Sequence, residues 1–364
     1  MNREADELET VSLNRDAYLQ YLEETLQAKS LALVRNRLAV LDQALAAPPG
    51  ELAGLFALGP GTEVRLRADV LRAEISRIGA VYTLKRARHY LKQLQAGASL
   101  NRTTGLNDIN LTRWKEYDEI LTDSLWLVDR RDTSGAHLGW YWGNFIPQIP
   151  HQLLLRYTSR GDWVLDPFLG SGTTLIECRR LGRHGIGVEL NPETAARAGE
   201  LVHREDNPHG VTTRVFTGDS AALDFVSLVD SLGADQVQLA LLHPPYHNII
   251  QFDDHPRNLC NAPDVEQFLD LFGRVVDNTD RVLARERFLA VVIGDRYTRG
   301  EWIPLGFYCM EQVRRRGYLL KSIIVKNFDQ TRGKRHQKEL WRYRALAGGF
   351  YVFKHEYILL FQKR

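Results

Sequence analysis

Residues 164–177 read "VLDPFLGSGTTLIE", and this stretch decides the class of fold. Its first apolar residues are expected to close a strand at Asp166. The glycines at 170 and 172 should then form a tight turn before a helix that begins near Thr173. Glycine lets the backbone come close to a ligand, and a helix N-terminus adds a positive field. The turn lacks the third glycine of a dinucleotide fingerprint and the GKS or GKT of a phosphate loop, so it disfavours hydride-transfer enzymes and nucleotide triphosphatases.

Outward from this stretch, strand-like runs alternate with helical ones. Helical stretches such as "TTLIECRRLG" and "VEQFLDLFGRVVDNTDRVL" lie between most of the strand candidates. Seven runs are strand candidates: "DWVLDP", "HGIGVEL", "TTRVFTGD", "VQLALLHPP", "RFLAVVIGD", "LKSIIVKNF" and "HEYILLFQK". This alternation predicts an α/β fold, a doubly wound and mostly parallel seven-stranded sheet with helices on both faces. Ligands of such sheets bind beyond the carboxyl ends of the strands.

Acidic residues end three successive strand candidates. Asp166 ends the first, Glu189 follows seventeen residues after Gly172, and Asp219 lies in "VFTGDS". A glutamate at the second strand end can accept both hydroxyls of a ribose, and Asp219 is placed to reach an adenine amino group. Any one of these acids is more often a turn residue. The three together favour a nucleoside without a phosphate as the ligand.

Three motifs carry a resemblance to a known family. "DPFLGSGTT", "GVELNP" and "HPPY" resemble the cofactor and catalytic motifs of the DNA amino-methyltransferases, which methylate N6 of adenine or N4 of cytosine with S-adenosyl-L-methionine. Residues 143–158, "GNFIPQIPHQLLLRYT", are similar to the segment that closes the methionine end of the cofactor pocket, and "FKHEYILLFQK" to the closing hairpin strand. The resemblance covers roughly residues 120–364 and implies a Rossmann-like methyltransferase sheet. Many relatives place the catalytic motif before the glycine loop, whereas this chain has the reverse order.

The resemblance implies a set of cofactor-binding residues. It carries over to Phe145, Pro147, Gln148, Asp166, Phe168, Gly170, Ser171, Gly172, Thr173, Thr174, Glu189 and Asp219. We therefore expect S-adenosyl-L-methionine as the cofactor and no metal.

The catalytic motif is implied to be His243, Pro244, Pro245 and Tyr246. The side chain at 243 and the carbonyl oxygen of Pro244 would accept hydrogen bonds from the target amine, the prolines would stiffen the loop, and Tyr246 would stack on a flipped base. The family usually has aspartate, asparagine or serine at the first position. Imidazole accepts only when neutral, so we expect activity to fall in acid. A strand-end histidine that caps a loop is the simpler alternative. Lack of an acid slightly favours cytosine N4 over adenine N6.

A basic segment near residues 329–349 is the candidate contact with double-stranded DNA. Within residues 330–349 Glu339 alone opposes its cations, and Trp341 and Tyr343 are interleaved. The cations are Arg332, Lys334, Arg335, Lys338, Arg342 and Arg344. Phosphate contacts from such a cluster would make affinity depend on salt. A solvated basic face is the more usual role of a charge run.

The first 112 residues are expected to form an α-helical domain, and residues 113–364 the catalytic domain. One helix is predicted over "YLQYLEETLQAKSLALVRNRLAVLDQAL" and a second from Thr62 to about Leu94. Two helices packed as a cap or dimer surface are favoured. A nucleic-acid role for the basic end of the second helix is the alternative; its residues are Lys85, Arg86, Arg88, His89 and Lys92.

Composition is that of a globular protein, with 44% hydrophobic and 25% charged residues and a net charge of +2. The three cysteines form no CxxC pair, which indicates neither a disulfide framework nor a zinc site. The polar N-terminus lacks the apolar run of a secretory signal, so a cytoplasmic protein without membrane contact is expected.

The leading hypothesis is a site-specific DNA methyltransferase of a restriction-modification type. An RNA base methyltransferase and a non-catalytic, cofactor-binding DNA-recognition subunit are the alternatives. A homodimer and a partner restriction or defence-system subunit stay open.

Overall fold

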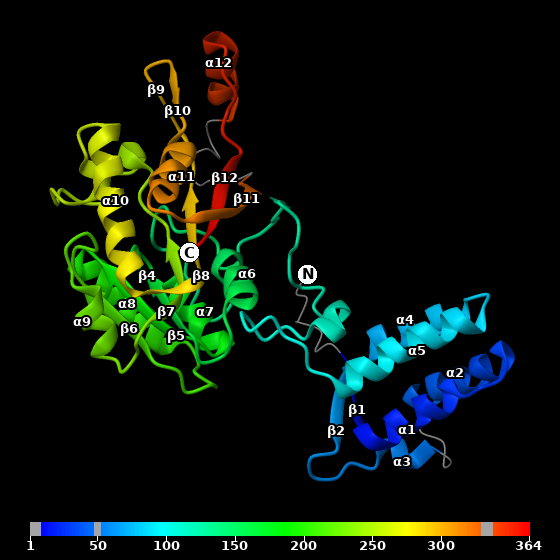
Figure 1. The fold of residues 1–364 in the computed structure, drawn as a ribbon. Helices are drawn as coiled ribbons and strands as arrows, with labels where there is room; N and C mark the ends of the chain where they lie inside the picture. The colour runs from blue at the N-terminus through cyan, green and yellow to red at the C-terminus, as the bar shows by residue number, and fades with distance from the viewer. Residues whose placement is uncertain (1–8, 47–51, 329–337) are drawn as a thin grey trace. The chain divides into compact units, whose positions relative to one another are not determined.

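The computed structural model describes residues 9–46, 52–328 and 338–364 of the 364-residue chain. The chain divides into two compact units, one of Met1–Thr104 and Ile109–Glu119 and the other of Gly105–Asp108 and Ile120–Arg364. The predicted division at residue 112 falls in the stretch where the chain passes between them. Figure 1 shows the elements of each unit.

The N-terminal unit is helical, with a two-stranded antiparallel sheet. Its core is built from Leu13, Tyr18, Leu38 and Ile78, all buried. Its elements are β1 (Thr10–Asn14), α1 (Arg15–Leu26), α2 (Leu31–Ala46), α3 (Ala53–Phe56), β2 (Glu63–Arg67), α4 (Ala68–Gly79), α5 (Leu84–Ser99) and the short η2 (Leu111–Glu116).

The prediction of two long helices in this unit was wrong. The first is divided into α1 and α2, because the Ser30 hydroxyl accepts a hydrogen bond from the Leu33 amide at 3.2 Å and so starts a new helix. The second begins as strand β2, whose residues alternate in burial and pair with β1, and only then becomes α4 and α5. Thr83 caps α5 by accepting from the Arg86 amide at 3.3 Å. In each case a local cap or a distant strand partner outweighed the helical period.

In the second unit, one eight-stranded sheet runs in the order β3-β11-β12-β8-β7-β4-β5-β6. All seven predicted strands are present, and the two-residue edge strand β3 was too short to leave a pattern. Only β12 runs antiparallel to its neighbours. The strands are β3 (Leu125–Trp126), β4 (Trp163–Asp166), β5 (His184–Glu189), β6 (Thr213–Thr217), β7 (Val237–Leu242), β8 (Leu283–Ile293), β11 (Leu319–Asn327) and β12 (His355–Gln362). The fold is the doubly wound, Rossmann-like α/β class.

Helices cover both faces of this sheet. They are α6 (Gln148–Tyr157), α7 (Thr173–Leu181), α8 (Pro192–Arg204), α9 (Phe225–Asp230), α10 (Val265–Val282) and α11 (Leu305–Arg315). Helix α12 (Lys338–Gly348) projects away from the sheet (Figure 1), and the remaining elements are the short η3 (His247–Ile249) and η4 (Leu259–Asn261) and the hairpin β9 (Arg296–Thr298) and β10 (Glu301–Ile303). Arg314 and Arg315 lie in the last turn of α11 and Arg316 caps it, where cations suit the negative end of the helix dipole. None of the described helices is long and apolar enough to cross a membrane.

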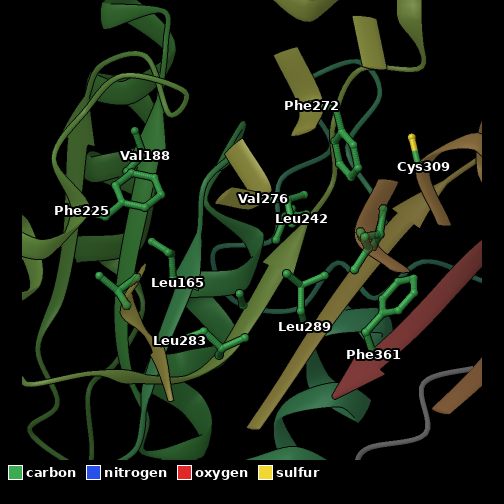
Figure 2. Close-up of a cluster of buried hydrophobic side chains, with 14 of the residues drawn as sticks. Leu165, Val188, Phe225, Leu242, Phe272, Val276, Leu283, Leu289, Cys309 and Phe361 are labelled. Carbon is green, nitrogen blue, oxygen red and sulfur yellow. The ribbon is translucent and has the colours of Figure 1, made fainter. Parts of the chain in front are cut away.

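Alternate strand residues face opposite cores. Leu165 and Leu242 pack with Phe225 of α9 and Phe272 of α10 in the cluster of Figure 2. Val164, the neighbour of Leu165, faces a second cluster with α6. Because both faces are buried, the central strands are apolar throughout, and their polar residues gather at the carboxyl ends.

Candidate active site

A cavity of about 1260 Å³ opens at the carboxyl ends of β4, β5, β6, β7 and β8. Its lining includes predicted residues of both kinds: Phe145, Phe168, Gly170, Glu189 and Asp219 of the cofactor set, and His243, Pro244, Pro245 and Tyr246 of the catalytic set. The other described members of the cofactor set do not line it: Pro147, Gln148, Asp166, Ser171, Gly172, Thr173 and Thr174. The lining also includes residues the sequence had not singled out, among them Tyr141, Phe252, Asp295, Lys326 and Glu356.

The glycine loop has the strained geometry that only glycine adopts easily. Gly170 has φ +52° and Gly172 has φ +85°. A Cβ at Gly170 would lie 3.0 Å from the Tyr141 ring, and one at Gly172 would lie 2.9 Å from a methyl group of Val202. Gly172 also precedes α7, so the N-terminus of that helix lies directly behind the loop.

Asp166 lies beneath the loop and organises it. It is 1% exposed and accepts hydrogen bonds from the Thr174 hydroxyl at 2.5 Å and the Phe168 amide at 3.0 Å. Burial raises the pKa of its carboxyl to about 7. Asp166 therefore holds the glycine loop in place without lining the cavity.

Glu189 and Asp219 face the cavity from neighbouring strand ends. Glu189 accepts from the amides of Gly170 at 2.9 Å and Asn191 at 3.0 Å, and burial raises its pKa. Its carboxylate can still accept further hydrogen bonds, because each oxygen has two lone pairs. Asp219 accepts from the Ala221 amide at 2.9 Å and pairs with Arg257 at 3.2 Å.

The segment before α6 forms another wall. Phe145 places its ring centroid 4.8 Å from that of His243. Pro147 and Gln148 begin α6, and the Gln148 side chain accepts from the Asp132 amide at 3.2 Å and donates to the Arg130 carbonyl oxygen at 2.7 Å. Gln148 thus braces the segment from outside the cavity.

This segment is joined to the glycine loop by polar side chains. The Asn144 amide group donates to the Ser171 hydroxyl, and the Thr173 hydroxyl donates to the Asn144 side-chain oxygen at 3.0 Å. Ser171 and Thr173 therefore hold the wall in place without facing the cavity.

A buried ionic cluster fixes the same segment to α7. Glu177 accepts from His137 at 2.6 Å and His151 at 2.7 Å. Burial alone would raise the pKa of Glu177, but the two histidines lower it to about 2. Asp132, His137 and Glu177 lie close enough to ligate a metal ion, but Arg180 already supplies positive charge, 3.3 Å from Asp132 and 3.4 Å from Glu177. The cluster is best explained as a structural anchor.

The loop of the predicted catalytic motif follows β7 and is tied to β11 and β12. His243 Nε2 lies 3.3 Å from the Tyr246 hydroxyl, which donates to Glu356 Oε2 at 2.9 Å. Glu356 Oε1 accepts from Lys326 Nζ at 2.9 Å, and these two residues are direct partners across β11 and β12. Burial lowers the pKa of His243 to about 4, so its imidazole is neutral at physiological pH. The ring of Tyr246 packs against Gly294, where a Cβ would approach it to 2.8 Å.

Sequence reasoning missed Lys326 and Glu356. One signal was present, because strand alternation puts Lys326 on the same face as Ile324, which is apolar and buried. A lysine on a buried face requires a partner of opposite charge.

The basic segment is only partly described. Arg332, Lys334, Arg335 and the side chain of Lys338 lie outside the described residues. Arg342 and Arg344 are exposed on α12, and Trp341 lines the cavity.

The β9–β10 hairpin lies against the end of this segment. Tyr297 stacks on Phe350 with ring centroids 4.0 Å apart, and Trp302 lies 4.2 Å from Phe353. Arg299, at the hairpin tip, has φ +51°. These contacts bring the hairpin and the chain after α12 together beside the mouth of the cavity.

The fold is the Rossmann-like α/β class, and comparison with known proteins gives local matches to one family of methyltransferases. Residues 86–200 match the DNA methylase family of N6 and N4 enzymes. Type II methyltransferase M.Cfr9I of Citrobacter freundii is 36% identical over 83 residues, 23% of this chain and 26% of that protein. Type II methyltransferase M.MjaII of Methanocaldococcus jannaschii is 46% identical over 52 residues, 14% of this chain and 10% of that protein. Over these stretches the chain is similar to the DNA amino-methyltransferases, a family that uses S-adenosyl-L-methionine.

These matches are local. The aligned parts span about a quarter and a tenth of the length of the two relatives. Among solved structures, TrmN from Thermus thermophilus is similar over 60% of this chain and 49% of its own, with 16% identity and a TM-score of 0.37. That similarity is too low to carry an argument about function.

Proposed function

We propose that this protein is an S-adenosyl-L-methionine-dependent DNA methyltransferase that methylates an exocyclic base amine after base flipping. One observation carries the proposal: the candidate nucleoside-binding acid Glu189 and the catalytic loop at His243 line the same cavity. A volume of about 1260 Å³ is large enough for a nucleoside cofactor and a flipped base together.

The cofactor end of the cavity suits an uncharged nucleoside. Glu189 would accept the ribose hydroxyls, Asp219 would accept from the adenine amine, and Phe168 supplies apolar surface. The glycine loop has backbone amides but lacks the lysine that a triphosphate would need. When bound, S-adenosyl-L-methionine supplies an electrophilic methyl group.

At the other end, the chain supplies hydrogen-bond acceptors for the target amine. The lone pair of that amine is delocalised into the base, and acceptors aimed at its N–H groups make the nitrogen more nucleophilic. The neutral His243 ring and the Pro244 carbonyl oxygen would be the two acceptors, held in place by the proline-stiffened loop. Tyr246 would offer its ring face to the flipped base. Removing one such preorganised group costs about 10²–10³ in kcat.

Cytosine N4 is slightly favoured as the target amine over adenine N6. A carboxylate at the first motif position is common in the adenine enzymes, and His243 takes its place here.

The DNA duplex would lie against α12 and the β9–β10 hairpin. Arg342 and Arg344 are exposed on α12, and Arg299 is at the hairpin tip. A non-glycine residue in left-handed conformation is energetically unfavourable and is often found at binding sites. Further phosphate contacts are proposed for four cations whose side chains lie outside the described residues: Arg332, Lys334, Arg335 and Lys338.

Methyl transfer with labelled S-adenosyl-L-methionine tests the proposal. The protein is incubated with duplex DNA and, separately, with RNA, each is digested to nucleosides, and the labelled nucleoside is identified. We expect label in N4-methylcytosine, and its near abolition in His243→Ala. His203→Ala, which changes an exposed histidine on α8, is the matched control and should keep full activity. Label in RNA alone, or in no nucleic acid, would refute the proposal.

A further inference from the structure

We infer that Lys326 and Glu356 are positioning residues that set the tautomer of His243, so that Nδ1 is the ring atom that accepts from the target amine. The inference rests on the proposed function, and it names which atom of the catalytic histidine is used. The sequence motif at residues 243–246 does not identify this ring atom, because both positioning residues lie in strands far along the chain from it.

The four side chains form one chain of contacts. Lys326 Nζ lies 2.9 Å from Glu356 Oε1, Glu356 Oε2 lies 2.9 Å from the Tyr246 hydroxyl, and that hydroxyl lies 3.3 Å from His243 Nε2. Lys326 is 4% exposed and Glu356 7%. The pair lies away from bulk water and forms a salt bridge.

Counting hydrogens along this chain leaves one arrangement. The ionised Glu356 has no hydrogen to give, so the Tyr246 hydroxyl must donate its single hydrogen to Glu356. That hydroxyl then has only lone pairs left for His243, so the ring must donate through Nε2–H. A neutral imidazole carries one hydrogen, and with Nε2 protonated the acceptor is Nδ1.

The remaining ring nitrogen is available for this role. Within the described parts of the chain, His243 makes its hydrogen bond through Nε2, and no hydrogen bond of Nδ1 is present. Nδ1 is also not one of the atoms that are both fully buried and without a partner. Because His243 lines the cavity, its accepting nitrogen can be offered to a ligand there. Burying a lysine and a glutamate is costly, and apolar residues of similar volume are often as stable or more so. A role in setting the tautomer accounts for the pair, whereas stability alone does not.

The test removes both charges and reads the tautomer directly. In Lys326→Met/Glu356→Leu, the Tyr246 hydroxyl loses its acceptor and can donate to His243 Nε2 instead, so the proton moves to Nδ1. Two-bond ¹H–¹⁵N correlation spectra report which ring nitrogen is protonated, and the His243 signals are assigned by their loss in His243→Asn. We expect protonated Nε2 in the parent and protonated Nδ1 in the double variant.

Activity gives a second measurement. The double variant should lose about tenfold or more in kcat, as is usual for partners that orient a catalytic group, with an unchanged Kd for S-adenosyl-L-methionine. Adding Tyr246→Phe should cost little more on that background, because the chain is already broken.

The matched control has the same chemistry elsewhere in the fold. Lys363 and Asp280 are 3.3 Å apart, and the Tyr318 hydroxyl donates to Asp280 at 2.7 Å. None of the three lines the cavity. Lys363→Met/Asp280→Leu should leave the His243 spectrum and kcat unchanged.

The outcomes separate the two proposals. A folded Lys326→Met/Glu356→Leu variant with the parental tautomer, or with parental kcat, would overturn the inference. Failure of the parent to methylate DNA would refute the proposed function alone, because the spectra report the tautomer without any turnover.

Discussion

The pH dependence of methyl transfer is the prediction in which structure and sequence differ most. The imidazole of His243 can accept from an amine only while it is neutral. An ordinary histidine has a pKa near 6.5, so the sequence predicts loss of activity just below neutral pH. In the structure, burial lowers the pKa of His243 to about 4, and Lys326 adds to that effect while Glu356 opposes it.

The size of the effect follows from that value. With a pKa of about 4, roughly 1% of the imidazole is protonated at pH 6 and about a tenth at pH 5. With a pKa of 6.5, roughly three quarters would be protonated at pH 6. The sign is the same in both cases, because protonation removes the acceptor. We therefore expect the His243-dependent part of kcat to be flat from pH 8 to 5 and half lost near pH 4.

The assay compares the parent with His243→Asn at each pH, at saturating cofactor. Asparagine keeps an acceptor oxygen but does not titrate, so the ratio of the two kcat values cancels the titration of Asp166 and Glu189. Circular dichroism at each pH confirms that both proteins stay folded. A midpoint of the ratio near pH 6.5 would show that His243 is not desolvated, and a ratio unchanged through pH 3.5 would remove it as an acceptor.

Three further predictions concern stability and DNA binding. Gly172→Ala should lower the free energy of unfolding by about 2 kcal/mol in urea titration, because φ is +85° and a Cβ would lie 2.9 Å from a methyl group of α8. The control is Gly210→Ala, where φ is +63° and no atom lies within 4 Å of the added Cβ. This control measures the backbone cost alone, so its free energy of unfolding should fall by less. Burial raises the pKa of the Asp166 carboxyl to about 7 in the folded state, so folding takes up a proton between about pH 4 and 7. As the pH falls from 7 toward 4, the free energy of unfolding of the parent should rise by up to about 1.4 kcal/mol per pH unit relative to that of Asp166→Asn. Urea titrations in which both proteins change equally with pH would contradict this. Arg342→Ala/Arg344→Ala should weaken duplex binding in anisotropy titrations and reduce the slope of log K against log salt by about 2, while the Kd for the cofactor stays unchanged. An unaltered slope would exclude both arginines as phosphate contacts.

The sequence predicted well what depends on neighbouring residues. The glycine turn at 170–172 is present, as are all seven strands and the acids at their ends. Buried parallel strands are apolar throughout, so they stand out in a sequence, and their first polar residues mark the ligand edge. The prediction failed where a cap or a distant partner decided the structure, as at Ser30 and at strand β2.

By itself, the sequence determined the class of fold and the loop at His243, because each depends on residues within one strand-turn-helix unit. Only the tertiary structure decided what surrounds that loop. It pairs Lys326 with Glu356 across two strands and brings that pair to Tyr246, 110 residues before Glu356 in the chain. It also half-buries His243, and this desolvation lowers the pKa of the ring. Burial and long-range pairing depend on which strands lie side by side, and the residues of one motif do not carry that information.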